Sequence, residues 1–180
     1  MKRSRIKGLS VLLLAFTVLP AAVIAQDDDN KLVTDAIEAK EAFQKSDGHL
    51  KTLFENSYGY AIFPNVGKGA VGVGGAAGNG VVYEHGNMIG RAKMKQVSVG
   101  FQFGGQAYRE VIFFENKEAL DRFKGDKFEF AAQVSAVAAA SGASADAKYR
   151  DGVLVFTQEK KGLMYEASVG GQKFSFEPNK

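Results

Sequence analysis

Three basic side chains at alternate positions, Arg91, Lys93 and Lys95, are the residues whose types and spacing best suit ligand binding. In a β-strand this spacing places all three on one face, across roughly 13 Å, and such a row could hold a phosphate-bearing group. The same lysines could instead decorate a solvent-facing or edge strand and discourage aggregation, and both interpretations stay open. Lys68 and the pair Lys160-Lys161 could add positive charge to the site.

The residue types that catalysis and metal binding require are scarce in this sequence. The chain has two histidines, His49 and His85, and no cysteine, and no local spacing supplies either histidine with carboxylate co-ligands. No GxSxG motif marks a serine nucleophile. The sequence therefore predicts a protein that is not an enzyme, with no catalytic residue, no metal site and no cofactor.

A glycine-rich block precedes the basic row. Seven of its fourteen residues are glycine: Gly67, Gly69, Gly72, Gly74, Gly75, Gly78 and Gly80. The first six residues fit GxGxxG, but the β-branched Val81 and Val82 follow where a dinucleotide site needs a helix, so nucleotide binding is not predicted. The pattern favours a strand-and-turn scaffold. A second interpretation is bare backbone against which a lipid headgroup could lie.

The N-terminal residues resemble a signal peptide. Four basic residues precede an apolar segment from Leu9 to Leu19, and small residues lead to an expected cleavage after Ala25. Without any cysteine the chain cannot carry a lipoprotein anchor, so we expect an exported, periplasmic or secreted protein. Of the 23 basic and 20 acidic residues, only four basic ones lie in residues 1–25, which leaves 19 basic and 20 acidic residues. This balance argues against nucleic acid as a partner.

Residues 26–180 have the size of a single domain, and its first segment, residues 30–57, is expected to be helical. Helical spacing predicts a first helix from Leu32, with the acidic run 27–29 and Asn30 at its N-terminus. Its apolar face is expected to contain Leu32, Val33, Ala36, Ile37, Ala39 and Phe43. A second helix is expected over 49–57 and a third over 117–123, capped by Asn116. The first helix carries as many acids as bases on its polar face, which favours a lid on a sheet over membrane insertion.

Alternating apolar residues predict two strands, at 97–103 and 128–134. Strands are also expected at 109–114, 152–157, 162–169 and 172–176, with a turn at 85–87. Many short strands with glycine-containing turns predict an α+β fold. Its sheet should be antiparallel and curled or closed like a barrel, with the N-terminal helices and one short helix packed on one side.

The order of these blocks resembles the SYLF domain, also called the Las17-binding-protein actin-regulator or DUF500 domain. The resemblance rests on the lead-in 60–66, the glycine block with its exit to 82, and the segments 99–106 and 111–114, and it covers nearly all of residues 26–180. It implies lipid binding, phosphoinositides included, and no catalysis. Some eukaryotic members also contact actin, whereas exported bacterial members mostly have no assigned role.

Two functions remain as expectations. The first is a non-catalytic module of the cell envelope that binds membrane lipid peripherally. It would place Lys68, Arg91, Lys93 and Lys95 at an anionic phospholipid or phosphoinositide-like headgroup, and apolar strand faces or the first helix at the acyl part. The alternative is a protein–protein interaction or structural domain of the envelope, whose exposed aromatic strands meet an unknown protein partner and which has no lipid ligand.

Overall fold

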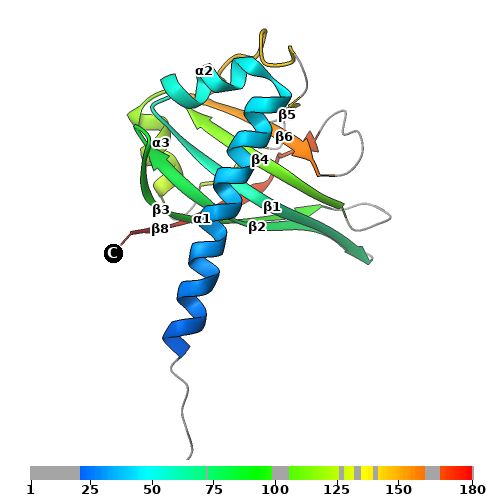
Figure 1. Cartoon of the computed structure of the whole chain (residues 1–180). Helices are drawn as coiled ribbons and strands as arrows, with labels where there is room; N and C mark the ends of the chain where they lie inside the picture. The colour runs from blue at the N-terminus through cyan, green and yellow to red at the C-terminus, as the bar shows by residue number, and fades with distance from the viewer. Residues whose placement is uncertain are drawn as a thin grey trace, which may run out of the picture.

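The computed structural model describes residues 21–71, 73–98, 106–125, 128–131, 135–139, 142–160 and 167–179. Within these ranges the chain is a mixed α+β fold of three helices and eight strands (Figure 1). The helices are α1 (Ala21–Ser46), α2 (Gly48–Asn56) and α3 (Lys117–Lys124). The strands are β1 (Gly59–Val71), β2 (Val73–Glu84), β3 (Asn87–Ser98), β4 (Gln106–Phe114), β5 (Ser135–Ala138), β6 (Val153–Glu159), β7 (Ala167–Ser168) and β8 (Gln172–Pro178).

The strands are ordered β7-β5-β6-β4-β1-β2-β3-β8, with the two-residue β7 added to the end of seven longer strands. The paired strands are antiparallel except β5 and β6, which run parallel over two residue pairs. The expectation of a purely antiparallel sheet is therefore wrong at β5. No pairing joins β7 to β8 among the described residues, so the closed, barrel-like form is not confirmed.

The sheet is nevertheless curled, because one stretch of chain reaches both of its ends. Phe130 N donates to Gln172 O and Phe174 N donates to Phe128 O, both at 3.0 Å, so residues 128–130 lie along β8. The chain then continues to β5, which lies next to β6 near the other end of the sheet. A short segment can connect these two positions only if the sheet bends.

Alternation along the strands produces two hydrophobic clusters, one on each face of the sheet. The cluster that we call inner contains Ala61 and Phe63 of β1, and the cluster on the opposite face, which we call outer, contains Tyr60 and Ile62. Helices α1 and α2 cover the outer face with buried residues that include Ala36, Ala39, Phe43, Leu50 and Phe54. Each fully buried Phe or Leu contributes about 1.5–3 kcal/mol, so both clusters matter for stability.

Helix α3 packs on the inner cluster, so the expectation that all helices share one side is wrong. Asn116 Oδ1 caps α3 by accepting from Ala119 N at 3.0 Å, as the sequence predicts. Only two residues separate β4 from α3, so the helix stays at the end of the sheet. There Leu120 and Phe123 are buried, and the Phe123 ring lies 4.9 Å from that of Phe114.

Helix α1 begins well before the position that the sequence predicts. It starts at Ala21, so the acidic run 27–29 lies inside the helix and does not cap it, and no glycine or proline interrupts residues 21–46. The expected cleavage after Ala25 falls within this helix, and cleavage there remains a prediction. Ile37 is 51% exposed, contrary to its expected place on the buried face, because the buried stripe is narrow and follows Ala36, Ala39 and Phe43.

Several of the other predicted elements are present in the structure. The strands at 109–114, 152–157 and 172–176, the helices at 49–57 and 117–123, and the 85–87 turn are all confirmed within three residues of their ends. The strand at 128–134 is wrong in its described part, residues 128–131, which form only an isolated bridge between Glu129 and Lys173. Of the strands at 97–103 and 162–169, only residues 97–98 and 167–169 lie in the described part of the chain.

The glycine block forms the end of the β1–β2 hairpin, so the strand-and-turn interpretation is confirmed. Gly69 pairs with Gly75, and Val71 pairs with Val73, while Gly72 lies outside the described residues. At Gly80 a Cβ atom would lie 2.6 Å from Phe63 Cδ1 and 2.8 Å from the carbonyl oxygen of Ile62, so a close approach of β1 requires glycine there.

Candidate functional site

The basic row lies on the outer face of β3. Ala92 and Met94 are 1% exposed and belong to the inner cluster, whereas Lys93 and Lys95 are exposed and Arg91 is half-buried. Side chains alternate across a strand, so the three cations share the face that α1 covers elsewhere. This is the geometry that the spacing of two predicts.

The three cations differ in their partners. Arg91 Nε lies 3.0 Å from Asp29 Oδ1 of α1, so this arginine forms an ion pair between the helix and the sheet. Lys93 Nζ lies 2.6 Å from Glu177 Oε1 of β8, and its hydrogen bond holds the pKa of that carboxyl below the usual value. Lys95 forms no ion pair with any residue that the structure describes, and its cross-strand partner on β8 is Lys173.

Lys93 and Lys95 stand beside a shallow cavity of about 300 Å³, which we call the β2–β3 hollow. It is lined by Asn65, Ala77, Gly78, Asn79, Lys93, Met94 and Lys95. Ala77, Gly78 and Asn79 are the cross-strand partners of Lys95, Met94 and Lys93. The glycine block and the basic row, which lie apart in the sequence, therefore build one site.

Asn65 brings a further cation to the edge of the β2–β3 hollow. Its Nδ2 donates to Asp35 Oδ2 at 3.0 Å, and its Oδ1 accepts from Lys160 Nζ. Burial lowers the pKa of Lys160, with a smaller contribution from nearby Arg109. Lys68 pairs through its backbone with Ala76 and Gln106, and its side chain lies outside the described part of the structure.

The two histidines lie apart from this hollow. His49 lies in the first turn of α2, where its backbone N donates to Asp47 Oδ1, and His85 is in the β2–β3 turn with its ring 4.3 Å from that of Tyr58. Among the described residues, no group of three or more histidines and carboxylates is placed to hold a metal ion. Of the described helices, none is long and apolar enough to cross a membrane.

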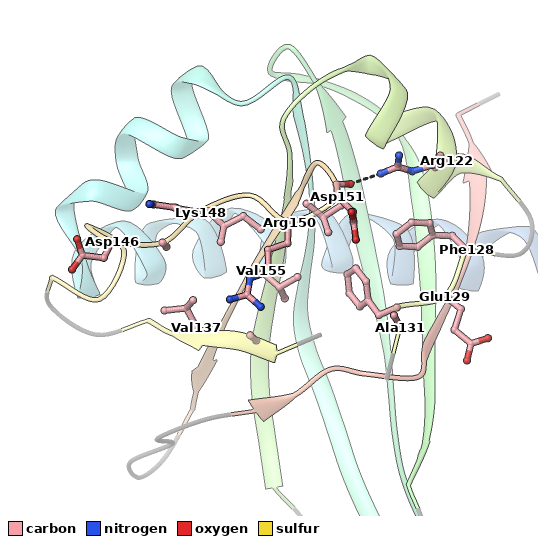
Figure 2. Close-up of a pocket in the computed structure, with 15 residues that line it drawn as sticks. Arg122, Phe128, Glu129, Ala131, Val137, Asp146, Lys148, Arg150, Asp151 and Val155 are labelled. Carbon is pink, nitrogen blue, oxygen red and sulfur yellow. Dashed lines mark hydrogen bonds between the residues drawn. The ribbon is translucent and has the colours of Figure 1, made fainter. Parts of the chain in front are cut away.

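A larger cavity, of about 790 Å³, lies at the other end of the strand order, beside β5 and β6 (Figure 2). Sequence analysis missed it, because its walls come from four separate stretches of chain. One signal was present in the sequence: Asp151-Gly152, a dipeptide typical of two-residue hairpin turns, directly precedes the apolar strand β6.

Comparison with known proteins supports the resemblance that the sequence motifs indicate. Residues 95–180 match the model of the Ysc84 family, described as Las17-binding protein actin regulator. Beta cell expansion factor A of Aeromonas veronii is 32% identical over 132 residues, which cover 69% of this chain and 48% of that protein. The chain thus spans about half the length of this curated relative. Through these matches the chain belongs to the SYLF, or Ysc84, family.

Proposed function

We propose that this protein is an exported, non-catalytic lipid-binding module that attaches peripherally to a membrane. An anionic phospholipid or phosphoinositide-like headgroup would occupy the β2–β3 hollow and contact Lys93 and Lys95. Arg91 would stay paired with Asp29 of α1 and contribute charge only indirectly. A direct contribution of Lys68 remains a prediction.

The observation that carries this proposal is the position of Lys95. Lys95 forms no ion pair among the described residues. It lies directly across from Lys173, whose Nζ is 3.4 Å from Glu129 Oε2, and two residues from Lys93, which pairs with Glu177. Like charges placed directly opposite on a sheet destabilise it. Glu129 offsets this repulsion only weakly, because the side chains of Lys173 and Glu129 are 69% and 48% exposed, and a phosphate at Lys95 would reduce it further. Because the side chains of Lys93 and Glu177 are 55% and 60% exposed, their ion pair is weak, and Lys93 can exchange it for a phosphate oxygen.

The acyl part of the lipid has a smaller role than the sequence suggests. The described strands place their large apolar side chains in the two clusters, so these strand faces offer little surface to an acyl chain. The exposed large hydrophobic residue of the described chain is Ile37 on α1. Headgroup contact with a shallow apolar anchor at Ile37 is therefore the binding mode that we propose.

The alternative function, an envelope interaction or structural domain without lipid, calls for exposed aromatic strands. The aromatic side chains of the described strands are buried or half-buried, and an extended apolar patch, the usual mark of a protein interface, is not seen on them. This supports the lipid proposal over an aromatic interface.

Co-sedimentation with phosphatidylglycerol or cardiolipin vesicles at low salt tests the proposal. The double variant Lys93→Gln/Lys95→Gln should bind about 30-fold more weakly, since each lysine near an anionic surface contributes about 1 kcal/mol. The variant Lys45→Gln/Lys51→Gln removes two exposed charges from α1 and α2 and is the matched control. Wild-type binding should weaken as salt rises. Equal loss in both double variants would contradict the site, and absence of vesicle binding together with a defined cross-linked protein would favour the alternative.

A further inference from the structure

The larger cavity opens where strands β5 and β6 separate. Their parallel ladder contains only the pairs Val137–Phe156 and Ala138–Thr157. Residues 128–131, which precede these pairs in the chain, follow β8, and within the described ranges no strand pairs with the first residues of β6 on that side. The cavity of about 790 Å³ fills this gap (Figure 2).

The walls of the cavity reach the inner hydrophobic cluster. Phe130, Ala136, Val153 and Val155 line the cavity and are also members of that cluster, with exposures between 2% and 7%. Phe128, at one side of the opening, is half-buried and packs on the same cluster. A molecule that enters here would therefore meet apolar side chains that otherwise form the inside of the sheet.

One solvent-exposed cation extends over the opening of this cavity. In Figure 2 the guanidinium group of Arg150 extends from its loop towards Val137 and Val155, whereas the charged ends of Asp146, Lys148 and Glu129 are directed away. Arg150 forms no ion pair and no side-chain hydrogen bond with the described residues. Its charge is thus available to an incoming anion.

A tight turn fixes the backbone of Arg150 beside the cavity. The N–H groups of Arg150 and Val153 each donate to the other residue's carbonyl oxygen, at 2.9 and 3.0 Å. Between them Asp151 and Gly152 have φ values of 50° and 75°, which is the geometry of a type I′ turn. A Cβ on Gly152 would lie 2.9 Å from Ala119 Cβ, so the turn also packs closely on α3.

The second arginine at the cavity is engaged by the protein. Arg122 donates to the backbone carbonyl of Asp151, the contact marked in Figure 2, and its guanidinium lies 3.7 Å from Glu118. Arg122 therefore links α3 to the turn that contains Asp151 and Gly152. This leaves Arg150 as the guanidinium that is positioned to meet a ligand.

We propose that the cavity binds a small single-chain amphiphile that carries a carboxylate. The carboxylate would pair with the planar guanidinium of Arg150, which matches its two oxygens, and the apolar chain would lie along Phe130, Ala136 and Val155. A volume of about 790 Å³ is in the usual range for sites that bind small molecules. This site is separate from the β2–β3 hollow and takes a different ligand.

Calorimetric titration with sodium decanoate, below its micelle-forming concentration, tests this proposal, with decanol and decyltrimethylammonium as neutral and cationic probes. Decanoate should bind at least tenfold more tightly than either, and Arg150→Gln should reduce decanoate affinity at least tenfold. Lys148→Gln removes a charge from the same loop, but one that points away, and should leave the affinity within twofold. Ala131→Trp, at an exposed wall position, should block all binding of decanoate while the circular dichroism spectrum stays unchanged.

Several results would overturn the proposal. These are failure of decanoate to bind the wild-type chain, equal binding of the cationic probe, and equal losses in Arg150→Gln and Lys148→Gln. Testing each variant in the assay for the other site distinguishes the two proposed sites. Arg150→Gln should bind phosphatidylglycerol vesicles as the wild type does, and Lys93→Gln/Lys95→Gln should retain decanoate binding.

Discussion

Replacing Asp47 by alanine should destabilise the fold by about 3–7 kcal/mol. The Asp47 carboxylate is 3% exposed and accepts hydrogen bonds from His49 N at 3.0 Å, Ser144 N at 2.9 Å and Ser144 Oγ at 2.8 Å. Loss of the α2 N-cap costs about 1 kcal/mol, and each buried donor left on Ser144 costs about 1–3 kcal/mol. Against a typical stability of about 5–15 kcal/mol, this is a large fraction.

The variants at this contact should follow a defined order. Asp47→Asn keeps one acceptor oxygen and should lose less than Asp47→Ala, and Ser144→Ala, which removes only the hydroxyl donor, should lose about 1 kcal/mol. Asp146→Ala, at an exposed position of the same loop, is the control and should change stability by less than about 0.5 kcal/mol. Urea unfolding followed by circular dichroism measures all four. A Ser144→Ala loss larger than that of Asp47→Ala would refute the reasoning.

Acid should weaken the same contact. Burial acts to raise the pKa of Asp47, but the hydrogen bonds from Ser144 and His49 outweigh it, so the pKa of this carboxyl lies below its ordinary 3.8. Its contribution to stability is therefore complete above the ordinary value, and it is lost as pH falls through the lower pKa of the folded state. Unfolding between pH 5 and pH 2 should be less steep in Asp47→Asn than in the wild type.

Two further substitutions test the packing of the sheet. Lys40 Nζ lies 5.2 Å from the ring centroid of Tyr60 and donates to its hydroxyl. Lys40→Ala should therefore lower the free energy of unfolding by about 1–2 kcal/mol in urea titrations. An unchanged free energy of unfolding would show that this contact does not stabilise the fold. Gly80→Ala should lower the thermal midpoint sharply, because its Cβ would overlap the Phe63 ring, whereas Gly67→Ala, with nothing within 4 Å, should leave it unchanged or slightly higher. Equal midpoints for the two glycine variants would show that Gly80 is not needed for the close approach.

The fold could be predicted wherever local pattern and tertiary packing agree. β8 alternates in sequence, β4 and β6 carry continuous apolar runs, and Asn116 is a strong N-cap signal, so these elements could be predicted. The positions of residues 128–131 beside β8 and of β5 beside β6 could not be predicted, because neither pairing is a local feature of the sequence. The early start of α1 was also hidden, since the acidic run has the composition of a helix cap and yet is compatible with helix interior.

Only part of the candidate site could be predicted from the sequence. The spacing of Arg91, Lys93 and Lys95 gives their common face, because alternation is a local property of strands. Their different partners depend on α1 and β8, which are distant in sequence, so the ion pair of Arg91 with Asp29 and the exposure of Lys95 opposite Lys173 required the structure. The position of Arg150 over the cavity likewise depends on how its turn packs on α3.

The position of the headgroup is the central claim, and amide chemical-shift mapping with short-chain phosphatidylglycerol at low salt tests it most directly. The largest shifts should fall on residues 77–79 and 93–95, which line the β2–β3 hollow, and they should shrink as salt is added. Shifts confined to α1 or to the cavity beside β6, or shifts that do not respond to salt, would contradict a headgroup site at Lys93 and Lys95.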